Sequence, residues 1–252
     1  MPIELLDFDS ERPALIEPGL RFPSGDLPER LLMSYFASPL ETLALKSGAL
    51  RAAPLRTFGL GLPVWVLGAG EQALALAPGG IGAPVAAGLL EELIARGARK
   101  ILVCGGAGSL DRALDPGDLL LPEEALRDEG LSHHYLPFPA PAKPSAKALD
   151  VLARTLADAR APHRLCRTWT TDALYRETPA RIASRQAQGA VCVEMEAAAL
   201  FAVAAFRGAE CAQLLYAGDD LASGTWDPRD WDLNIPVQER MHALCLEALR
   251  RF

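Results

Sequence analysis

Apolar and polar positions alternate along the chain in blocks whose lengths separate strands from helices. Short runs rich in Val, Leu, Ile and Ala predict buried strands, at 31–35, 64–68, 73–77, 100–104, 118–122, 164–168, 191–193 and 211–217. Longer segments with an apolar face or strong helix formers predict helices, at 40–48, 85–96, 146–159, 179–188, 197–205 and 235–250. Polar stretches at 127–135, 170–178 and 221–234 are expected loops. This alternation is typical of one α/β domain.

The strand pattern also indicates the kind of sheet. Runs that are apolar at every position are typical of parallel strands covered on both faces. We therefore expect a single α/β domain over residues 31–252, with a twisted, mostly parallel central sheet flanked by helices. Residues 1–30 are rich in Pro, Glu and Asp and predict an irregular N-terminal arm.

Composition narrows the class of protein. Half of the 252 residues are apolar, and the net charge of −7 argues against a nucleic-acid or anionic-membrane partner. The five cysteines form no Cys-x-x-Cys pair and lie in or beside apolar runs, as in proteins of a reducing compartment. No positively charged leader and no uninterrupted apolar run of about 20 residues is seen. These features predict a cytoplasmic protein.

Two pairs of acids follow predicted strands. Glu194 and Glu196 flank Met195, where the run 191–193 gives way to a buried helix. Two interpretations stay open: Glu196 caps the helix and Glu194 pairs with an arginine, or a carboxylate is held there to bind hydroxyl groups or a developing cation. Asp219 and Asp220 end the next apolar run. If both strands are parallel, all four acids lie along the sheet edge where α/β proteins bind ligands.

Two glycine-rich turns, at 78–84 and 105–109, could bring backbone N–H groups close to an anion, although many such turns only make a tight bend. Neither is a Gly-x-Gly-x-x-Gly or Walker motif. His133 and His134 are adjacent and predict no metal site. Ser109 has no neighbouring histidine to activate it, so we do not expect a nucleophilic serine.

The segment 193–200, Val-Glu-Met-Glu-Ala-Ala-Ala-Leu, is similar to the signature of the nucleoside phosphorylase and nucleosidase superfamily. Further matches in the same order cover the chain from about residue 30: Gly80–Pro84, Gly105–Leu110, Asp115–Asp118, Thr171–Tyr175 and Gly218–Asp219. The resemblance implies a phosphorylase/hydrolase-like fold. It also implies an enzyme of nucleoside metabolism, active in purine or pyrimidine salvage, which cleaves the N-glycosidic bond and uses no cofactor.

The resemblance assigns roles to individual residues. Glu196 would bind ribose hydroxyls and stabilise the oxocarbenium-like transition state, and Asp219 would protonate or hydrogen-bond the leaving base. The implied ribose- and base-binding residues are Glu194, Met195, Val193, Leu174, Tyr175 and Asp172. The implied phosphate- or anion-binding residues are Gly80, Gly105, Gly106, Ser109 and Arg127.

At two places the sequence differs from the family's phosphate-binding pattern. Val103 and Gly106 stand where phosphorylases usually carry an Arg and a Ser or Thr. The family's Gly-Asp-Pro-x-Arg loop should follow the first strand, whereas the similar segment 24–30 precedes it. Either other groups hold phosphate, among them Arg30, Arg56 and Arg127, or water is the nucleophile.

We expect phosphorolysis of a nucleoside to free base and ribose 1-phosphate, with inorganic phosphate as co-substrate. The alternatives are a hydrolytic N-ribosyl hydrolase and a nucleoside-binding protein without turnover. The resemblance further implies a homo-oligomer, a dimer or a trimer of dimers. The loop 221–234, with Trp226 and Trp231, is expected to be a lid over the base or a subunit contact.

Overall fold

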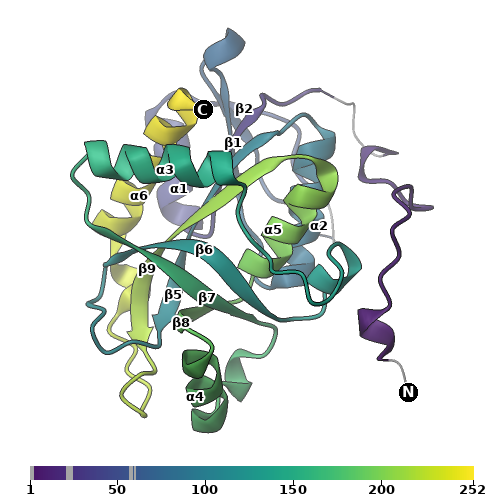
Figure 1. The fold of residues 1–252 in the computed structure, drawn as a ribbon. Coiled ribbons are helices and arrows are strands. Elements are labelled where there is room, and N and C mark those ends of the chain that lie inside the picture. Colours follow the sequence, from purple (N-terminus) through teal and green to yellow (C-terminus); the bar gives the residue numbers. More distant parts are fainter. Residues whose placement is uncertain (1–2, 21–24, 57–58, 60) are drawn as a thin grey trace.

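The computed structural model describes residues 3–20, 25–56, 59 and 61–252. In these residues nine strands form one sheet, and helices pack on both of its faces (Figure 1). The strands are β1 Arg30–Ser34, β2 Leu50–Arg51, β3 Trp65–Leu67, β4 Leu74–Pro78, β5 Lys100–Ser109, β6 Leu119–Asp128, β7 His163–Thr171, β8 Ala190–Glu194 and β9 Glu210–Asp220. The α-helices are α1 Ala37–Lys46, α2 Ala83–Ala95, α3 Ala146–Asp158, α4 Pro179–Ala187, α5 Ala197–Arg207 and α6 Ile235–Arg251.

The sheet closes on itself. Its strand order is β2-β3-β4-β1-β5-β8-β7-β6-β9, and β9 pairs back onto β5. Five strands therefore make a barrel, from which β1 to β4 extend as an open sheet. The pairings of β1 with β4 and β5, of β5 with β9, and of β7 with β6 and β8 are parallel, and the remaining four are antiparallel. The predicted α/β domain is confirmed, but the sheet is mixed and its closure was not foreseen.

Two layers of helices bury the sheet. On one face α2 and α5 pack over Leu31, Met33, Val103 and Cys211. On the other face α1, α3 and α6 cover a second core cluster, which includes Leu102 and Leu214 (Figure 1). The centre of β5 has helices on both faces, which is why its sequence reads as one continuous apolar run.

Strand β6 is the main departure from the predicted elements. The sequence predicts a strand at 118–122 and a loop from 127, whereas β6 continues to Asp128 and pairs with β7 along its length. Apart from the buried Ala125, its second half has exposed or half-buried side chains. The apolar run stops before the strand does, because the half-covered part of the strand carries polar residues. Pro122 and the register shift beside it also interrupt the alternation of buried and exposed positions.

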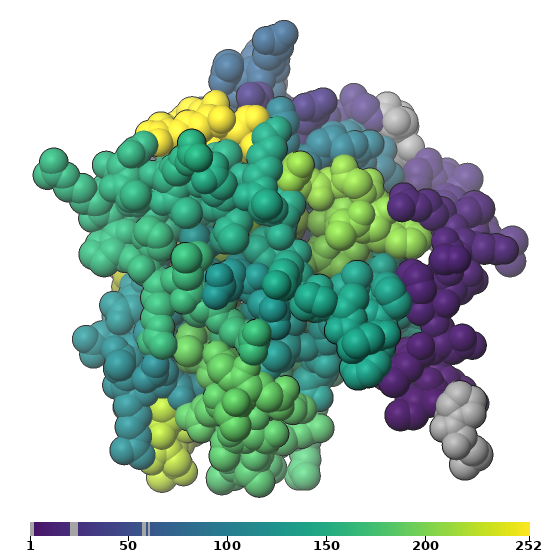
Figure 2. Space-filling view, in the orientation of Figure 1, coloured from purple at the N-terminus to yellow at the C-terminus, as the bar shows by residue number. Residues whose placement is uncertain are grey.

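The described part of the N-terminal arm contains two short 3-10 turns, Glu4–Leu6 and Pro18–Leu20. It lies along the outer side of α5 (Figure 2), where Arg12 Nη1 donates to the carbonyl of Phe206 and Glu17 pairs with Arg207. Residues 1–2 and 21–24 of the predicted arm are outside the described residues. Within the described chain, every helix is too short or too polar to cross a bilayer.

The Arg96 guanidinium is fully buried. It donates three hydrogen bonds of 2.8 to 3.2 Å to the Asp26 carboxylate and one of 2.8 Å to the carbonyl of Ala53. These contacts tie the end of α2 to the segments before β1 and after β2.

We expect Arg96→Ala to lower the free energy of unfolding by about 3 kcal/mol, because it removes a fully buried guanidinium and its hydrogen bonds to the Asp26 carboxylate and the Ala53 carbonyl. Urea denaturation measures the change. Arg154→Ala is the matched control, since its pair with Asp150 is exposed, and it should cost less than about 0.5 kcal/mol. Equal losses in the two variants would contradict this interpretation.

Candidate active site

A cavity of about 680 Å³ lies beside the end of β8 and the middle of β5. Its lining residues are Tyr35, Phe36, Ile81, Gly106, Ala107, Gly108, Leu174, Tyr175, Glu177, Thr178, Val193, Glu194, Met195, Glu196, Gln213, Asp219, Leu221, Trp226 and Trp231. Thus segments far apart in sequence meet here, and both acid pairs contribute a member. The directions of their strands differ from the prediction: relative to β5, β9 is parallel and β8 is antiparallel. The acids come together because the sheet closes, and not because they share one parallel edge.

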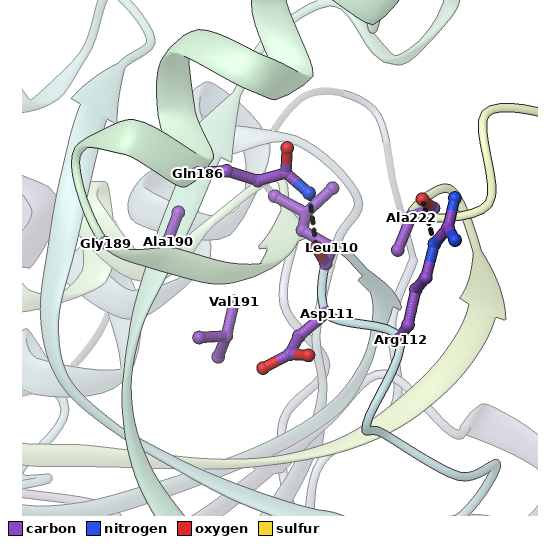
Figure 3. A pocket seen from close by; sticks show the side chains of 8 residues that line it. All are labelled: Leu110, Asp111, Arg112, Gln186, Gly189, Ala190, Val191 and Ala222. Carbon is purple, nitrogen blue, oxygen red and sulfur yellow. Dashed lines mark hydrogen bonds between the residues drawn. The ribbon is translucent and has the colours of Figure 1, made fainter.

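A second pocket, of about 420 Å³, lies between α4 and the turn after β5 (Figure 3). Its polar side chains are already engaged: Gln186 Nε2 donates to the Leu110 carbonyl, and Arg112 Nε donates to the Ala222 carbonyl. None of the predicted site residues lines it. The larger cavity is therefore the candidate site.

Glu194 caps helix α5. Its Oε2 accepts hydrogen bonds from the N–H groups of Glu196 (2.7 Å) and Ala197 (2.6 Å), and its Oε1 accepts one from the Thr170 hydroxyl (2.6 Å). The bonded N–H groups are the otherwise unpaired donors of a helix N-terminus, which favours a negative charge. Burial nevertheless raises the pKa of Glu194 above its usual range. The capping interpretation thus holds for Glu194 instead of Glu196, and Glu194 makes no ion pair with an arginine in the described structure.

Glu196 is buried at the cavity wall. Its Oε1 accepts a hydrogen bond of 2.6 Å from the N–H of Gly82, in the turn before α2. Burial, together with the neighbouring Glu194 carboxyl, raises the pKa of Glu196 to about 8. The first glycine turn does bring a backbone N–H to an acidic group, but that group is the side-chain carboxyl of Glu196. A carboxyl that is buried and shifted in this way, in a cavity, is typical of a functional group.

Asp219 lies in β9 on the cavity wall, half-buried. Trp226 Nε1 donates to its Oδ2 at 2.7 Å, which leaves Oδ1 toward β5. A Cβ atom at Gly108 would lie 3.3 Å from that Oδ1 and 2.6 Å from Leu221 Cδ1, so only glycine leaves room there. Burial raises the pKa of Asp219 above its usual range.

Glu177 is a cavity residue that sequence reasoning did not select. Its carboxyl has no hydrogen-bond partner among the described residues, and burial and the charge of Asp219 raise its pKa to about 7. In the sequence, only its position two residues after Tyr175 indicates that Glu177 could belong to the site. A single Glu in a polar loop is usually a surface residue, so this indication is weak.

Apolar and aromatic side chains form the mouth of the cavity. Leu174 and Tyr175 line it from the loop after β7, and both are exposed. Trp226 and Trp231 line it from the loop after β9. The Trp231 side chain lies over Gly106 and Gly218: an added Cβ atom would be 3.0 Å from its ring at Gly106 and 3.3 Å from its ring at Gly218. A flat base would find stacking surfaces here.

Not every predicted residue reaches the cavity. Asp172 is exposed and accepts a hydrogen bond from the N–H of Gly130. Among the anion-binding candidates, Gly106 lines the cavity, whereas Gly80, Gly105, Ser109 and Arg127 do not. Gly80 faces Val85 of α2, and the buried Ser109 hydroxyl has no partner in the described structure.

The Arg127 guanidinium is used inside the fold. It donates to the Ser132 hydroxyl, to His133 Nδ1 and to the carbonyls of Leu136, Pro137 and Ala140, and so holds the loop after β6. His133 is thereby engaged as well. Across the described residues, no three His, Cys, Asp or Glu side chains gather as metal ligands would.

The cavity is acidic and without cations. Four carboxyl groups line it, and no Arg, Lys or His of the described chain does. The segment directly after β1 is Tyr35-Phe36, with no arginine. Of the segment 24–30, Ser24 is outside the described residues, Asp26 pairs with Arg96, and Arg30 Nη1 donates to the carbonyl of Glu71.

Comparisons with known proteins agree on one family. A family model described as "Phosphorylase superfamily" matches residues 36–251. A guanosine phosphorylase of Halorubrum lacusprofundi is 29% identical over 161 residues, which are 64% of this chain and 67% of that protein. A purine nucleoside phosphorylase of Plasmodium falciparum is 29% identical over 174 residues, 67% of this chain and 70% of that protein. The crystal structure of an AMP nucleosidase from Bacteroides thetaiotaomicron has the same fold, with a TM-score of 0.72 and 22% identity over 90% of this chain and 89% of that chain.

The raised pKa of Glu196 makes stability depend on pH. Between the usual value of 4.5 and about 8, the unfolded chain has lost this proton and the folded chain keeps it, so stability falls as pH rises through that window. We expect Glu196→Gln to match the wild type near pH 4.5 and to exceed it by on the order of a few kcal/mol at pH 8.5. Urea denaturation across pH 4.5 to 9 measures the difference. Glu41→Gln, at an exposed site on α1, should show the same dependence of stability on pH as the wild type. If the difference in the free energy of unfolding between the wild type and Glu196→Gln does not change with pH, the raised pKa of Glu196 is refuted.

Proposed function

Because the chain belongs to the phosphorylase superfamily, whose members cleave nucleosides at the N-glycosidic bond, we propose that it does so in the cavity between Glu196 and Asp219. The observation that carries this proposal is a pair of carboxyl groups that line one cavity and have a raised pKa each: Glu196, buried just after β8, and Asp219, half-buried in β9. The cavity volume lies in the range of small-molecule sites. The class of reaction needs both a group that stabilises a cationic sugar and a group that protonates the leaving base.

The two carboxyls have separate roles. The ionised form of Glu196, which becomes more populated as the pH approaches its pKa of about 8, accepts hydrogen bonds from the ribose hydroxyls and stabilises the positive charge that develops on the sugar. Met195, beside it, packs under the sugar. Asp219 holds a proton on Oδ1 and gives it to the base nitrogen as the glycosidic bond breaks, while Trp226 binds its Oδ2. Burial of Asp219 supports this, because it keeps the acid protonated closer to neutral pH.

The base lies among Leu174, Tyr175 and the two tryptophans. Glu177 supports a base that presents N–H groups along its edge, as guanine does, because its carboxyl lacks a partner in the described chain. The guanosine and purine nucleoside phosphorylases among the relatives point to the same substrates.

Water is the nucleophile that the cavity supports best. A phosphate dianion beside four carboxyl groups would need a positive partner, and the lining residues of the described chain include none. The second candidate is phosphorolysis to ribose 1-phosphate, favoured by the names of the relatives. It would require a second copy of the chain to bring an arginine or lysine to the cavity, as part of a homo-oligomer.

The test is chromatographic detection of free base from a panel of purine and pyrimidine nucleosides, with and without inorganic phosphate. We expect guanosine to be cleaved in phosphate-free buffer, giving guanine and ribose. Cleavage that occurs only with phosphate would establish phosphorolysis. If nucleosides bind and no base is released, the chain is a nucleoside-binding protein without turnover, and the enzymatic proposal is refuted.

Asp219→Asn should lower kcat for the preferred nucleoside by about 10²- to 10³-fold, because the base must then leave without a proton. With 4-nitrophenyl riboside, whose leaving group needs no proton, the loss should be less than about 10-fold. The matched control is Asp220→Asn, since Asp220 pairs with Arg229 on the protein side. Any loss of kcat in Asp220→Asn should be the same with the nucleoside and with 4-nitrophenyl riboside. If Asp219→Asn also loses the same factor in kcat with both substrates, the acid role is contradicted.

A further inference from the structure

The floor of the cavity holds two polar side chains that the described protein leaves unpaired. Gln213, in β9, is 1% exposed, and neither its Oε1 nor its Nε2 has a hydrogen-bond partner. The Tyr35 hydroxyl, directly after β1, is buried and lacks a partner as well. Both residues line the cavity. An unpaired buried amide or hydroxyl costs free energy unless a ligand or water satisfies it.

The two side chains lie on the same face of the sheet. Gln213 pairs with Val103 and Leu215 pairs with Gly105, so Gln213, Leu215 and Gly105 share one face. The Tyr35 ring lies on this face over Gly105, where an added Cβ atom would be 3.1 Å from Tyr35 Cδ2. On its other side, an added Cβ at Gly79 would be 2.7 Å from Tyr35 Cε1.

The Tyr35 ring therefore occupies the space between the two glycine-rich segments. The sequence suggests this space for an anion, and the tyrosine fills it with a neutral group. Burial raises the pKa of Tyr35, and the charges of Glu196 and Glu194 raise it further, so the hydroxyl keeps its proton and lies near both carboxyls.

A hydroxyl and a carboxamide beside a carboxylate suit a water molecule. Together they offer N–H and O–H donors and a carbonyl acceptor, and a buried water needs two to four such partners. They lack the positive charge that a phosphate dianion would require.

We propose that Tyr35 and Gln213 hold the water molecule that attacks the sugar. This inference rests on the proposed hydrolytic function. The water oxygen forms a bond to the anomeric carbon while the C–N bond breaks, and the bonding pair stays on the base nitrogen. Asp219 gives its proton to the base, and ionised Glu196 takes one from the water. The products are free base and ribose, and both carboxyls then exchange protons with solvent.

Two variants remove the polar atoms and keep the volumes: Tyr35→Phe and Gln213→Met. Each should lower kcat in phosphate-free buffer by about 10- to 100-fold and change KM for the nucleoside less than about 3-fold, because the substrate is bound by other groups. Thr155→Val is the matched control. It removes a buried hydroxyl of α3 that bonds the Val151 carbonyl, away from the cavity, and should leave kcat unchanged. Thermal melts identify the folded variants.

Methanol provides a readout that a structural defect would not move. Added at a few molar, it competes with water and gives methyl riboside, and the ratio of methyl riboside to ribose is independent of how much enzyme is active. Loss of the water-holding groups should raise that ratio several-fold in Tyr35→Phe and in Gln213→Met, and leave it unchanged in Thr155→Val.

The outcomes separate the two proposals. If the wild type cleaves nucleosides without phosphate, and both variants keep its kcat and its product ratio, the water-holding role is overturned while the hydrolytic function stands. If the wild type turns over only with phosphate, hydrolysis and the water-holding role both fail. Phosphate stimulation that disappears in Tyr35→Phe would show that these residues hold phosphate, and would also overturn the inference.

Discussion

The carboxylate of Glu194 at the N-terminus of α5 organises this site. It accepts hydrogen bonds from the N–H groups of Glu196 and Ala197. The Thr170 hydroxyl donates to the same carboxylate and accepts from the N–H of Ala198, in the first turn of the helix. The backbone of Glu196 is therefore held between β8 and α5, and its side chain accepts a hydrogen bond from the N–H of Gly82. Glu194, buried and bound to the helix N-terminus, thus fixes the backbone position of a second buried acid, Glu196.

The electrostatics of the cavity favour one kind of transition state. Glu194, Glu196, Glu177 and Asp219 bring carboxyl groups into a space with no positive side chain of the described chain. To the extent that these carboxyls are ionised, such a site stabilises a cation and repels an anion. A sugar that becomes positively charged as its bond to the base breaks matches it well, because that charge exists only in the transition state.

Much of the fold followed from sequence pattern, because the strands of the core are apolar at every position. The apolar pattern ends early in β6, because half of that strand is exposed to solvent. The pattern also gives no sign that the sheet closes, because backbone hydrogen bonds between β5 and β9 do not depend on a periodic arrangement of side chains. Of the site, Glu196, Asp219, Val193, Met195, Leu174 and Tyr175 were placed from motif resemblance and do meet at the cavity. Tyr35, Gln213 and Glu177 were not selected, since an isolated polar residue in or after an apolar strand gives no signal until the opposing segments are known.

Strand β5 has a consequence for how such a protein can change during evolution. It pairs with β8, which ends two residues before Glu196, and with β9, which carries Asp219, and its glycines leave space for the side chains that face it. A substitution in β5 would therefore disturb the sugar side and the base side together, and selection should hold it nearly constant. The loop 221–234 is tied to β9 at several points: Asp227 pairs with Asp220, the Tyr216 hydroxyl donates to the carbonyl of Trp231, and Trp226 Nε1 donates to Asp219. A change in this loop is therefore felt at the same cavity wall, and the loop and the strand should evolve together.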